Sequence, residues 1–144
     1  MGIVNRFKNK VVFLDTSPLI YYIEGHSKYQ ESLQKVFRSN DLAEFQFITS
    51  TLTLLEVIVH PLKLNQQNLA DQYENILTTS ETIEIVELST EIAKRSAQLR
   101  VDYNLKTPDA IQVATALEKN ADYFFTNDKG LKKIREVEVI TLTA

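Results

Sequence analysis

Four acidic residues stand beside an apolar segment or at the boundary of a predicted element, where a carboxylate needs an explanation: Asp15, Glu56, Asp109 and Asp128. Asp15 directly follows the apolar run 11–14, and Asp128 comes shortly after the aromatic run 123–125. Carboxylate oxygens are the ligands that Mg²⁺ and Mn²⁺ prefer. One or two such ions can activate a water molecule, neutralise a phosphate and stabilise a departing oxygen.

The surroundings of Glu56 and Asp109 strengthen this hypothesis. Glu56 lies in the apolar segment 52–59, which predicts a buried helix. An ionised Glu there costs several kcal/mol unless it is paired or binds a cation, and no Lys or Arg lies within one turn. Thr107 is a suitable N-cap and Pro108 suits the first helical position, so Asp109 opens a helix whose dipole favours its ionised form.

Taken alone, each of these acids also has a purely structural interpretation. Asp15 can cap the helix that follows it, although Ser17 is the better cap in the sequence. Asp109 can be an ordinary first-turn acid, and Asp128 can belong to a turn. Glu56 can pair with a distant Lys or Arg. The hypothesis of a metal site therefore depends on all four acids meeting in one crevice.

The elements predicted around these acids alternate between strands and helices. Short β-branched or aromatic runs predict strands at 11–14, 45–48, 83–86, 123–125 and 137–140. Apolar periodicity predicts helices at 17–24, 29–39 and 51–60, and around 69–77, 92–103 and 110–117, with a short turn after Asp128. This order predicts a three-layer α/β fold, with a mostly parallel central sheet of four to five strands flanked by helices. Ligands bind such sheets beyond the carboxyl ends of the strands, where Asp15 and Asp128 are expected.

Composition sets the remaining limits. The 144 residues are 44% hydrophobic and 24% charged, with only three Gly and three Pro, which predicts a single domain over 1–144. The absence of Cys excludes disulfides and thiol catalysis and suits a reducing cytoplasm. No apolar run is long enough to predict a signal peptide or a membrane span. The net charge is −3; without the four acids, 15 acidic residues face 16 basic ones, which argues against coating nucleic acid by bulk charge.

Four segments, in this order, resemble the PIN domain, and most of all its stand-alone VapC-type toxins: Val-Val-Phe-Leu-Asp15-Thr-Ser, Leu-Thr-Leu-Leu-Glu56-Val, Thr-Pro-Asp109-Ala-Ile-Gln-Val-Ala and Tyr-Phe-Phe-Thr-Asn-Asp128-Lys-Gly-Leu. The resemblance spans nearly the whole chain. It implies a hydrolase, a Mg²⁺- or Mn²⁺-dependent endoribonuclease whose catalytic metal ligands are Asp15, Glu56, Asp109 and Asp128. It also implies that three further residues contact the ligands or the substrate phosphate, namely Ser17, Thr126 and Asn127. An RNA substrate, a homodimer and a partner antitoxin that covers the crevice follow from the same resemblance.

The mechanism expected from this resemblance is in-line attack of activated water on a phosphodiester, which leaves 5′-phosphate and 3′-hydroxyl ends. One alternative is a catalytically inactive PIN-like scaffold that binds a protein partner. Another is a receiver-like signalling domain, which needs an acceptor Asp at the end of a middle strand. The second predicted strand ends in Ile-Thr-Ser and only Glu87 lies near the end of the third, so this alternative is disfavoured.

Two further groups have open interpretations. Four basic residues after Asp128 either meet the RNA backbone or form a solvated helix face: Lys129, Lys132, Lys133 and Arg135. Tyr21 and Tyr22 offer rings that can stack on bases, but at least one of them is expected in the core. The lack of a glycine-rich phosphate loop argues against ATP or dinucleotide binding.

Overall fold

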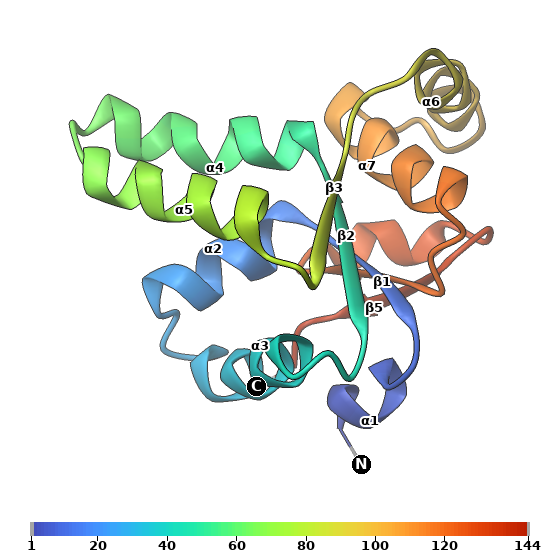
Figure 1. The fold of residues 1–144 in the computed structure, drawn as a ribbon. Helices are drawn as coiled ribbons and strands as arrows, with labels where there is room; N and C mark the ends of the chain where they lie inside the picture. Colours follow the sequence, from blue (N-terminus) through green and yellow to red (C-terminus); the bar gives the residue numbers. More distant parts are fainter. Residues whose placement is uncertain (1, 144) are drawn as a thin grey trace.

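The centre of the molecule is a parallel β-sheet, seen edge-on among its helices in Figure 1. The computed structural model describes residues 2–143, and this range contains five strands: β1 (Val11–Leu14), β2 (Gln46–Ser50), β3 (Ile83–Val86), β4 (Tyr123–Thr126) and β5 (Glu138–Thr141). Their order in the sheet is β3-β2-β1-β4-β5, and every neighbouring pair is parallel. The α/β fold with a central sheet of four to five strands, predicted from the sequence, is confirmed. A receiver-like domain has the order 2-1-3-4-5 instead, so that alternative is wrong.

Helices cover both faces of the sheet. The same range contains α1 (Ile3–Phe7), α2 (Thr16–Glu24), α3 (Gln30–Asp41), α4 (Thr51–Lys63), α5 (Gln67–Thr79), α6 (Thr90–Tyr103), α7 (Thr107–Glu118) and the 3₁₀ helix η1 (Lys129–Lys133). Helices α1 to α5 pack on one face, and α6, α7 and η1 pack on the other. Figure 1 shows α4 and α5 extending side by side beyond the sheet as a two-helix arm.

The alternation of side chains along β1 separates the two core clusters. Val12 and Leu14 point into the cluster beneath α1 to α5, while Phe13 points into the cluster beneath α6 and α7. All three are fully buried. Because both faces of β1 are covered, its residues are apolar throughout, as the sequence pattern predicted.

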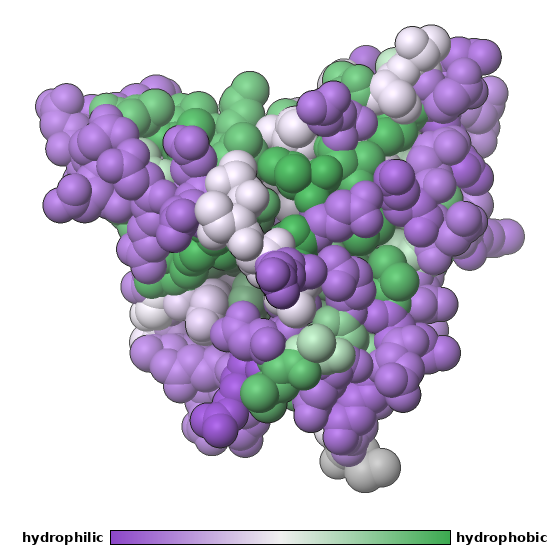
Figure 2. Space-filling view, in the orientation of Figure 1, coloured by the Kyte–Doolittle hydropathy of each residue, from purple (hydrophilic) through white to green (hydrophobic). Residues whose placement is uncertain are grey.

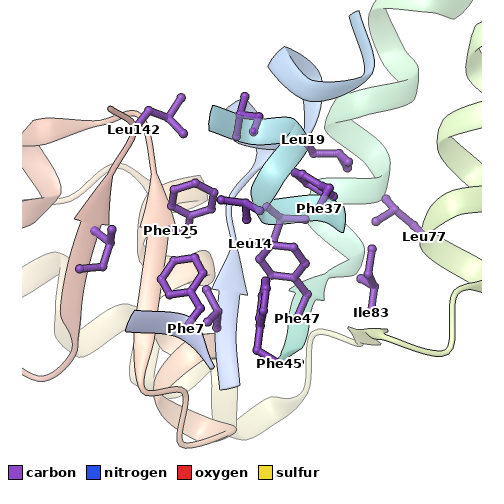
Figure 3. Close-up of a cluster of buried hydrophobic side chains, with 14 of the residues drawn as sticks. Phe7, Leu14, Leu19, Phe37, Phe45, Phe47, Leu77, Ile83, Phe125 and Leu142 are labelled. Atoms are coloured by element: carbon purple, nitrogen blue, oxygen red, sulfur yellow. The ribbon is translucent and has the colours of Figure 1, made fainter. Parts of the chain in front are cut away.

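Helix α1 was not predicted, because five residues are too few to show a helical period. It is held by Phe7, which is fully buried. The Phe7 ring centroid lies 5.3 Å from that of Phe45, 5.6 Å from that of Tyr123 and 5.4 Å from that of Phe125. Figure 3 shows Phe7 between Phe45 and Phe125 in the core. Tertiary packing, not local propensity, therefore fixes this helix.

Helix α4 departs from the prediction in length and in burial. It continues to Lys63 through Pro61, although residue 60 was the predicted end. Pro61 is buried, and its carbonyl accepts a hydrogen bond from the Gln66 N–H at 2.8 Å, which ends the helix and starts the turn to α5. The helix is not buried on all sides, since the Leu55 side chain is 56% exposed. No helix in the described range is long and apolar enough to cross a membrane.

Removing the Phe7 ring tests whether α1 is part of the stable fold. Phe7→Ala is expected to lower the free energy of unfolding by about 3–5 kcal/mol, because three aromatic neighbours lose their contact and a cavity remains. Phe7→Leu keeps most of the volume and should cost less. Urea denaturation followed by circular dichroism measures both variants. Equal stability of Phe7→Ala and the unaltered chain would show that α1 contributes nothing to the core.

Candidate functional site

The four acids belong to segments that meet at the carboxyl edge of the sheet. The chain leaves β1 toward β2 on one side, while β4 and β5 lie on the other side, so the strand order reverses between β1 and β4. Such a switch point is where ligands bind in open parallel sheets. Asp15 follows β1 and its N–H donates to the Phe125 carbonyl at 3.0 Å, which extends the pairing of β1 with β4 by one residue.

Asp15 is both the N-cap of α2 and the most heavily hydrogen-bonded acid of the group. Its Oδ1 accepts from the Thr16 N–H at 2.8 Å and from Gln112 Nε2 at 3.3 Å, and its Oδ2 accepts from Thr126 Oγ1 at 2.7 Å. The expectation that Ser17 caps this helix is wrong, because the extended backbone of Asp15 turns its own carboxylate onto the first N–H. The Ser17 hydroxyl joins none of these hydrogen bonds.

Burial raises the pKa of Asp15 above its ordinary value, and the negative charge of Glu56 raises it further. The hydrogen bonds from Thr126, Thr16 and Gln112 act in the opposite direction, because they favour the ionised carboxylate. The net shift is upward, so an anion at this position is unfavourable relative to an exposed Asp.

Glu56 reaches the same edge from α4. Its Oε1 accepts from Thr16 Oγ1 at 2.6 Å, and the Thr16 hydroxyl lies 3.3 Å from that of Thr53. Thr16 therefore connects two acids, since its backbone donates to Asp15 and its side chain donates to Glu56. The alternative pairing of Glu56 with a distant Lys or Arg is not found: no ion pair among residues 2–143 involves any of the four acids.

Asp109 lies in the first turn of α7, as predicted, but the cap differs. Lys106, not Thr107, is the N-cap, because its extended backbone directs its carbonyl to the Ala110 N–H at 3.0 Å. Partial burial raises the pKa of Asp109, and the charges of Asp15 and Asp128 raise it further, while Lys106 lowers it. Asp109 thus lies within electrostatic range of Asp15 and Asp128.

Asp128 forms the exposed end of the group. Its Oδ1 accepts from the Gly130 N–H at 2.9 Å and caps η1, so its turn role is real. Its own N–H donates to Thr126 Oγ1 at 3.0 Å. Thr126 is fully buried and connects Asp15 to Asp128, and the Asn127 side chain donates to the Tyr21 hydroxyl at 3.2 Å.

Sequence reasoning missed a buried polar network behind the acids. Gln112 is 2% exposed and donates to Asp15, and to Thr53 Oγ1 at 2.7 Å, while its amide oxygen accepts from the Ser50 hydroxyl. The signal in the sequence was an amide three residues after Asp109 on an otherwise apolar helix face. Its partners come from the end of β1, from β2 and from α4, so only the folded chain identifies them.

The acids are close but do not form a closed coordination shell. Across residues 2–143, no three His, Asp or Glu side chains are arranged to hold one ion directly. Oxygens of Asp15 and Glu56 accept hydroxyl and amide hydrogen bonds instead. This part of the sheet edge is therefore electronegative, and the donors that the four acids offer are all oxygens. Their role as metal ligands stays a prediction.

Comparisons with known proteins agree with this architecture. A chain of a toxin–antitoxin complex from Klebsiella pneumoniae is 29% identical, with a TM-score of 0.69 over 91% of this chain and 96% of that one. VapBC2 from Rickettsia felis, bound to a promoter DNA fragment, gives 17% identity and a TM-score of 0.76 over 92% and 99%. VapC20 from Mycobacterium tuberculosis, a Sarcin-Ricin loop cleaving toxin, gives 14% and 0.65 over 78% and 86%.

The comparison with family models decides the classification. No curated protein sequence matches the chain. The model of the PIN domain, in contrast, matches residues 12–137, a range that includes Asp15, Glu56, Asp109 and Asp128. This chain belongs to the PIN-domain family.

Proposed function

We propose that this chain is a Mg²⁺- or Mn²⁺-dependent endoribonuclease, the toxin of a toxin–antitoxin pair. The supporting observation is that carboxylates from four separate segments meet at one sheet edge, bridged by Thr16 and Thr126 or coupled through their charges. Members of the PIN family are typically nucleases that use divalent metals. We also infer that it acts in the cytoplasm, as PIN toxins generally do.

The acids fit a divalent cation by their chemistry. The donor set is entirely oxygen, which suits Mg²⁺ or Mn²⁺, and the raised pKa values of Asp15 and Asp109 reflect burial and mutual repulsion that a cation would offset. Asp15, Glu56, Asp109 and Asp128 would hold it. When bound, the ion supplies activation of water and neutralisation of phosphate charge.

The neighbouring residues position the acids and the substrate. Thr126 and Gln112 orient the Asp15 carboxylate, and Thr16 orients that of Glu56. Ser17 and Asn127 are proposed to contact the scissile phosphate or the acids. The four basic residues that follow Asp128 are exposed and are proposed to meet the RNA backbone: Lys129, Lys132, Lys133 and Arg135.

A separate apolar face supports binding of a second copy. A groove of about 500 Å³ is lined mainly by α6 and α7, and an adjoining groove extends from it to α4; Leu88 and Ile111 line both. Val101 lines the first groove and is 78% exposed, and Leu55 lines the second and is 56% exposed. Figure 2 shows hydrophobic side chains gathered in the hollow between the α4 arm and α6 with α7. We infer a homodimer through this face and an antitoxin over the acidic crevice.

Cleavage of RNA tests the proposed reaction. With Mn²⁺ or Mg²⁺ the chain should cut labelled RNA into products with 5′-phosphate and 3′-hydroxyl ends, and EDTA should stop it. Asp15→Asn should reduce the rate by at least about 100-fold, because it removes a metal ligand. Asp71→Asn, on the exposed side of α5, is the matched control and should cleave normally.

Three outcomes contradict this proposal. Cleavage that survives both EDTA and Asp15→Asn would indicate a contaminant. Products that end in 2′,3′-cyclic phosphates would exclude attack by activated water. Binding of a partner protein without any RNA cleavage would favour the inactive scaffold.

The pH dependence of stability tests the metal site without activity. Since the folded chain raises the pKa of Asp109, it binds more protons than the unfolded chain between pH 4 and the folded pKa, and it loses stability as pH rises through that window. In EDTA at pH 7, Asp109→Asn should therefore raise the melting temperature by about 3 °C. The difference should disappear below about pH 4.

Mn²⁺ should then raise the melting temperature of the unaltered chain more than that of Asp109→Asn, because only the former offers all four carboxylates. Scanning fluorimetry from pH 4 to 8, with EDTA or MnCl₂, measures both effects. An equal Mn²⁺ shift in the two proteins would remove Asp109 from the ligand set.

Disruption of the apolar face tests the dimer. Leu55→Arg places a charge in the proposed interface and should weaken dimerisation by at least about tenfold, because a buried unpaired charge is costly. Leu42→Arg is the matched control, since Leu42 is 64% exposed at the end of α3, outside both grooves. Light scattering after size-exclusion chromatography gives the mass. A monomeric unaltered chain, or a dimer that tolerates Leu55→Arg, would contradict this interface.

A further inference from the structure

Three aromatic rings lie together near the acids, and we call them the aromatic cluster: Tyr21, His26 and Tyr29. The Tyr21 and His26 centroids are 4.4 Å apart, those of His26 and Tyr29 are 4.9 Å apart, and Tyr21 is stacked with Tyr29 at 5.9 Å. All three are partly exposed. The cluster is thus a partly exposed aromatic surface, with Tyr21 and Tyr29 packed against the core beneath it.

The fold separates the two tyrosines that the sequence left equivalent. Tyr22 stacks on Phe37 with centroids 4.0 Å apart and planes inclined by 2°, on the core side of α2. Tyr21 instead joins the cluster. Gly25, at φ 75°, ends α2 in the left-handed conformation, and the Gly25 and His26 N–H groups both donate to the Tyr21 carbonyl. This turn folds His26 back against the Tyr21 ring.

A hydrogen bond connects the cluster to the crevice. Asn127 Nδ2 donates to the Tyr21 hydroxyl at 3.2 Å. Asn127 lies between Thr126, which donates to Asp15, and Asp128. A substrate whose phosphate lies at the acids therefore has this aromatic surface next to it on the α2 side.

Lys28 supplies a cation at the outer side of the cluster. Its Nζ lies 5.2 Å from the Tyr29 ring centroid, and the side chain is exposed. An exposed cation–π contact is weak, so a base can replace the ammonium on the ring. The released charge is then available to a neighbouring phosphate of the same strand.

We propose that the aromatic cluster stacks an unpaired base of the RNA substrate next to the scissile phosphate. This inference rests on the proposed function. Aromatic rings bind bases through their π-faces, which are available only in unpaired segments. Such stacking tolerates any base, so the cluster selects for strandedness and not for sequence.

Binding of a fluorescein-labelled, unstructured RNA oligonucleotide in EDTA, followed by fluorescence anisotropy, tests this proposal apart from cleavage. Tyr29→Leu should weaken binding by roughly 5- to 150-fold, the range for loss of one stacked base. Tyr103→Leu is the matched control and should bind normally. Tyr103 bonds to Glu136 in the segment that enters β5, at the opposite edge of the sheet.

Two further variants guard against a folding defect. His26→Asn removes a ring but retains an acceptor for the Lys28 N–H, which His26 Nδ1 accepts at 3.2 Å. It should also weaken binding. Tyr103→Phe keeps its ring at a position remote from the cluster and loses the hydroxyl contact with Glu136, so it should bind as well as the unaltered chain. Melting curves of all variants establish that they are folded.

An abasic strand of the same length identifies stacking as the cause. With it, Tyr29→Leu and the unaltered chain should bind equally, because no base remains to stack. The proposal is overturned if Tyr29→Leu and His26→Asn bind ordinary RNA normally, if the loss is as large with the abasic strand, or if duplex RNA binds as tightly as single strands. Base-dependent binding without Mn²⁺-dependent cleavage would contradict the proposed nuclease function and still support the base-stacking site. Absence of any RNA binding would contradict both proposals.

Discussion

The carboxylate of Asp15 is the constraint on which the arrangement of the site depends. It is buried, and it accepts hydrogen bonds from α2, α7 and β4, through Thr16, Gln112 and Thr126. A buried anion without such partners would be strongly unfavourable. Each donor is itself positioned by a different layer of the fold, so the pairing of β1 with β4 and the packing of α7 are both required to place this one group.

The burial of these carboxylates also explains why the site lowers the stability of the folded chain. Hydroxyl and amide donors lower the pKa of Asp15, but burial and the charge of Glu56 outweigh them. The pKa of Asp109 is raised by burial and by the charges of Asp15 and Asp128. In a fold selected only for stability, some of these acids would be replaced or moved apart, as in surface-charge optimisation. Groups whose pKa values are shifted by burial and by one another cluster at functional sites. The upward shifts therefore support a site that is completed by a positive charge from outside the chain.

What the sequence could predict follows from the range of the forces involved. The strands, Asp15 and Asp128 were identified because buried parallel strands are apolar throughout and an acid at their ends is conspicuous. Glu56 was identified because it interrupts an apolar helix, and Asp109 because it follows a proline that begins one. Helix α1 was not predicted because it is stabilised by the packing of Phe7 on residues remote in sequence. The role of Gln112 was not predicted because its partners Ser50 and Thr53 are also remote in sequence. The apolar character of α4 was misinterpreted as burial, since hydrophobic pattern alone does not distinguish a core from an exposed face, as Leu55 shows. The caps at Asp15 and Lys106 depend on backbone angles that several residues could adopt.

Helix α4 connects the group of four acids to the apolar face. Glu56 turns inward and accepts the Thr16 hydroxyl, while the adjacent Leu55 faces outward on the apolar face. Because neighbouring residues on a helix share its backbone, a subunit that covers Leu55 also restrains the segment that carries Glu56. Glu56 extends from the two-helix arm and is linked to Asp15 by hydrogen bonds through Thr16. Association at the apolar face would therefore restrain the helix that carries Glu56, which gives dimerisation a direct consequence for the geometry of the four acids.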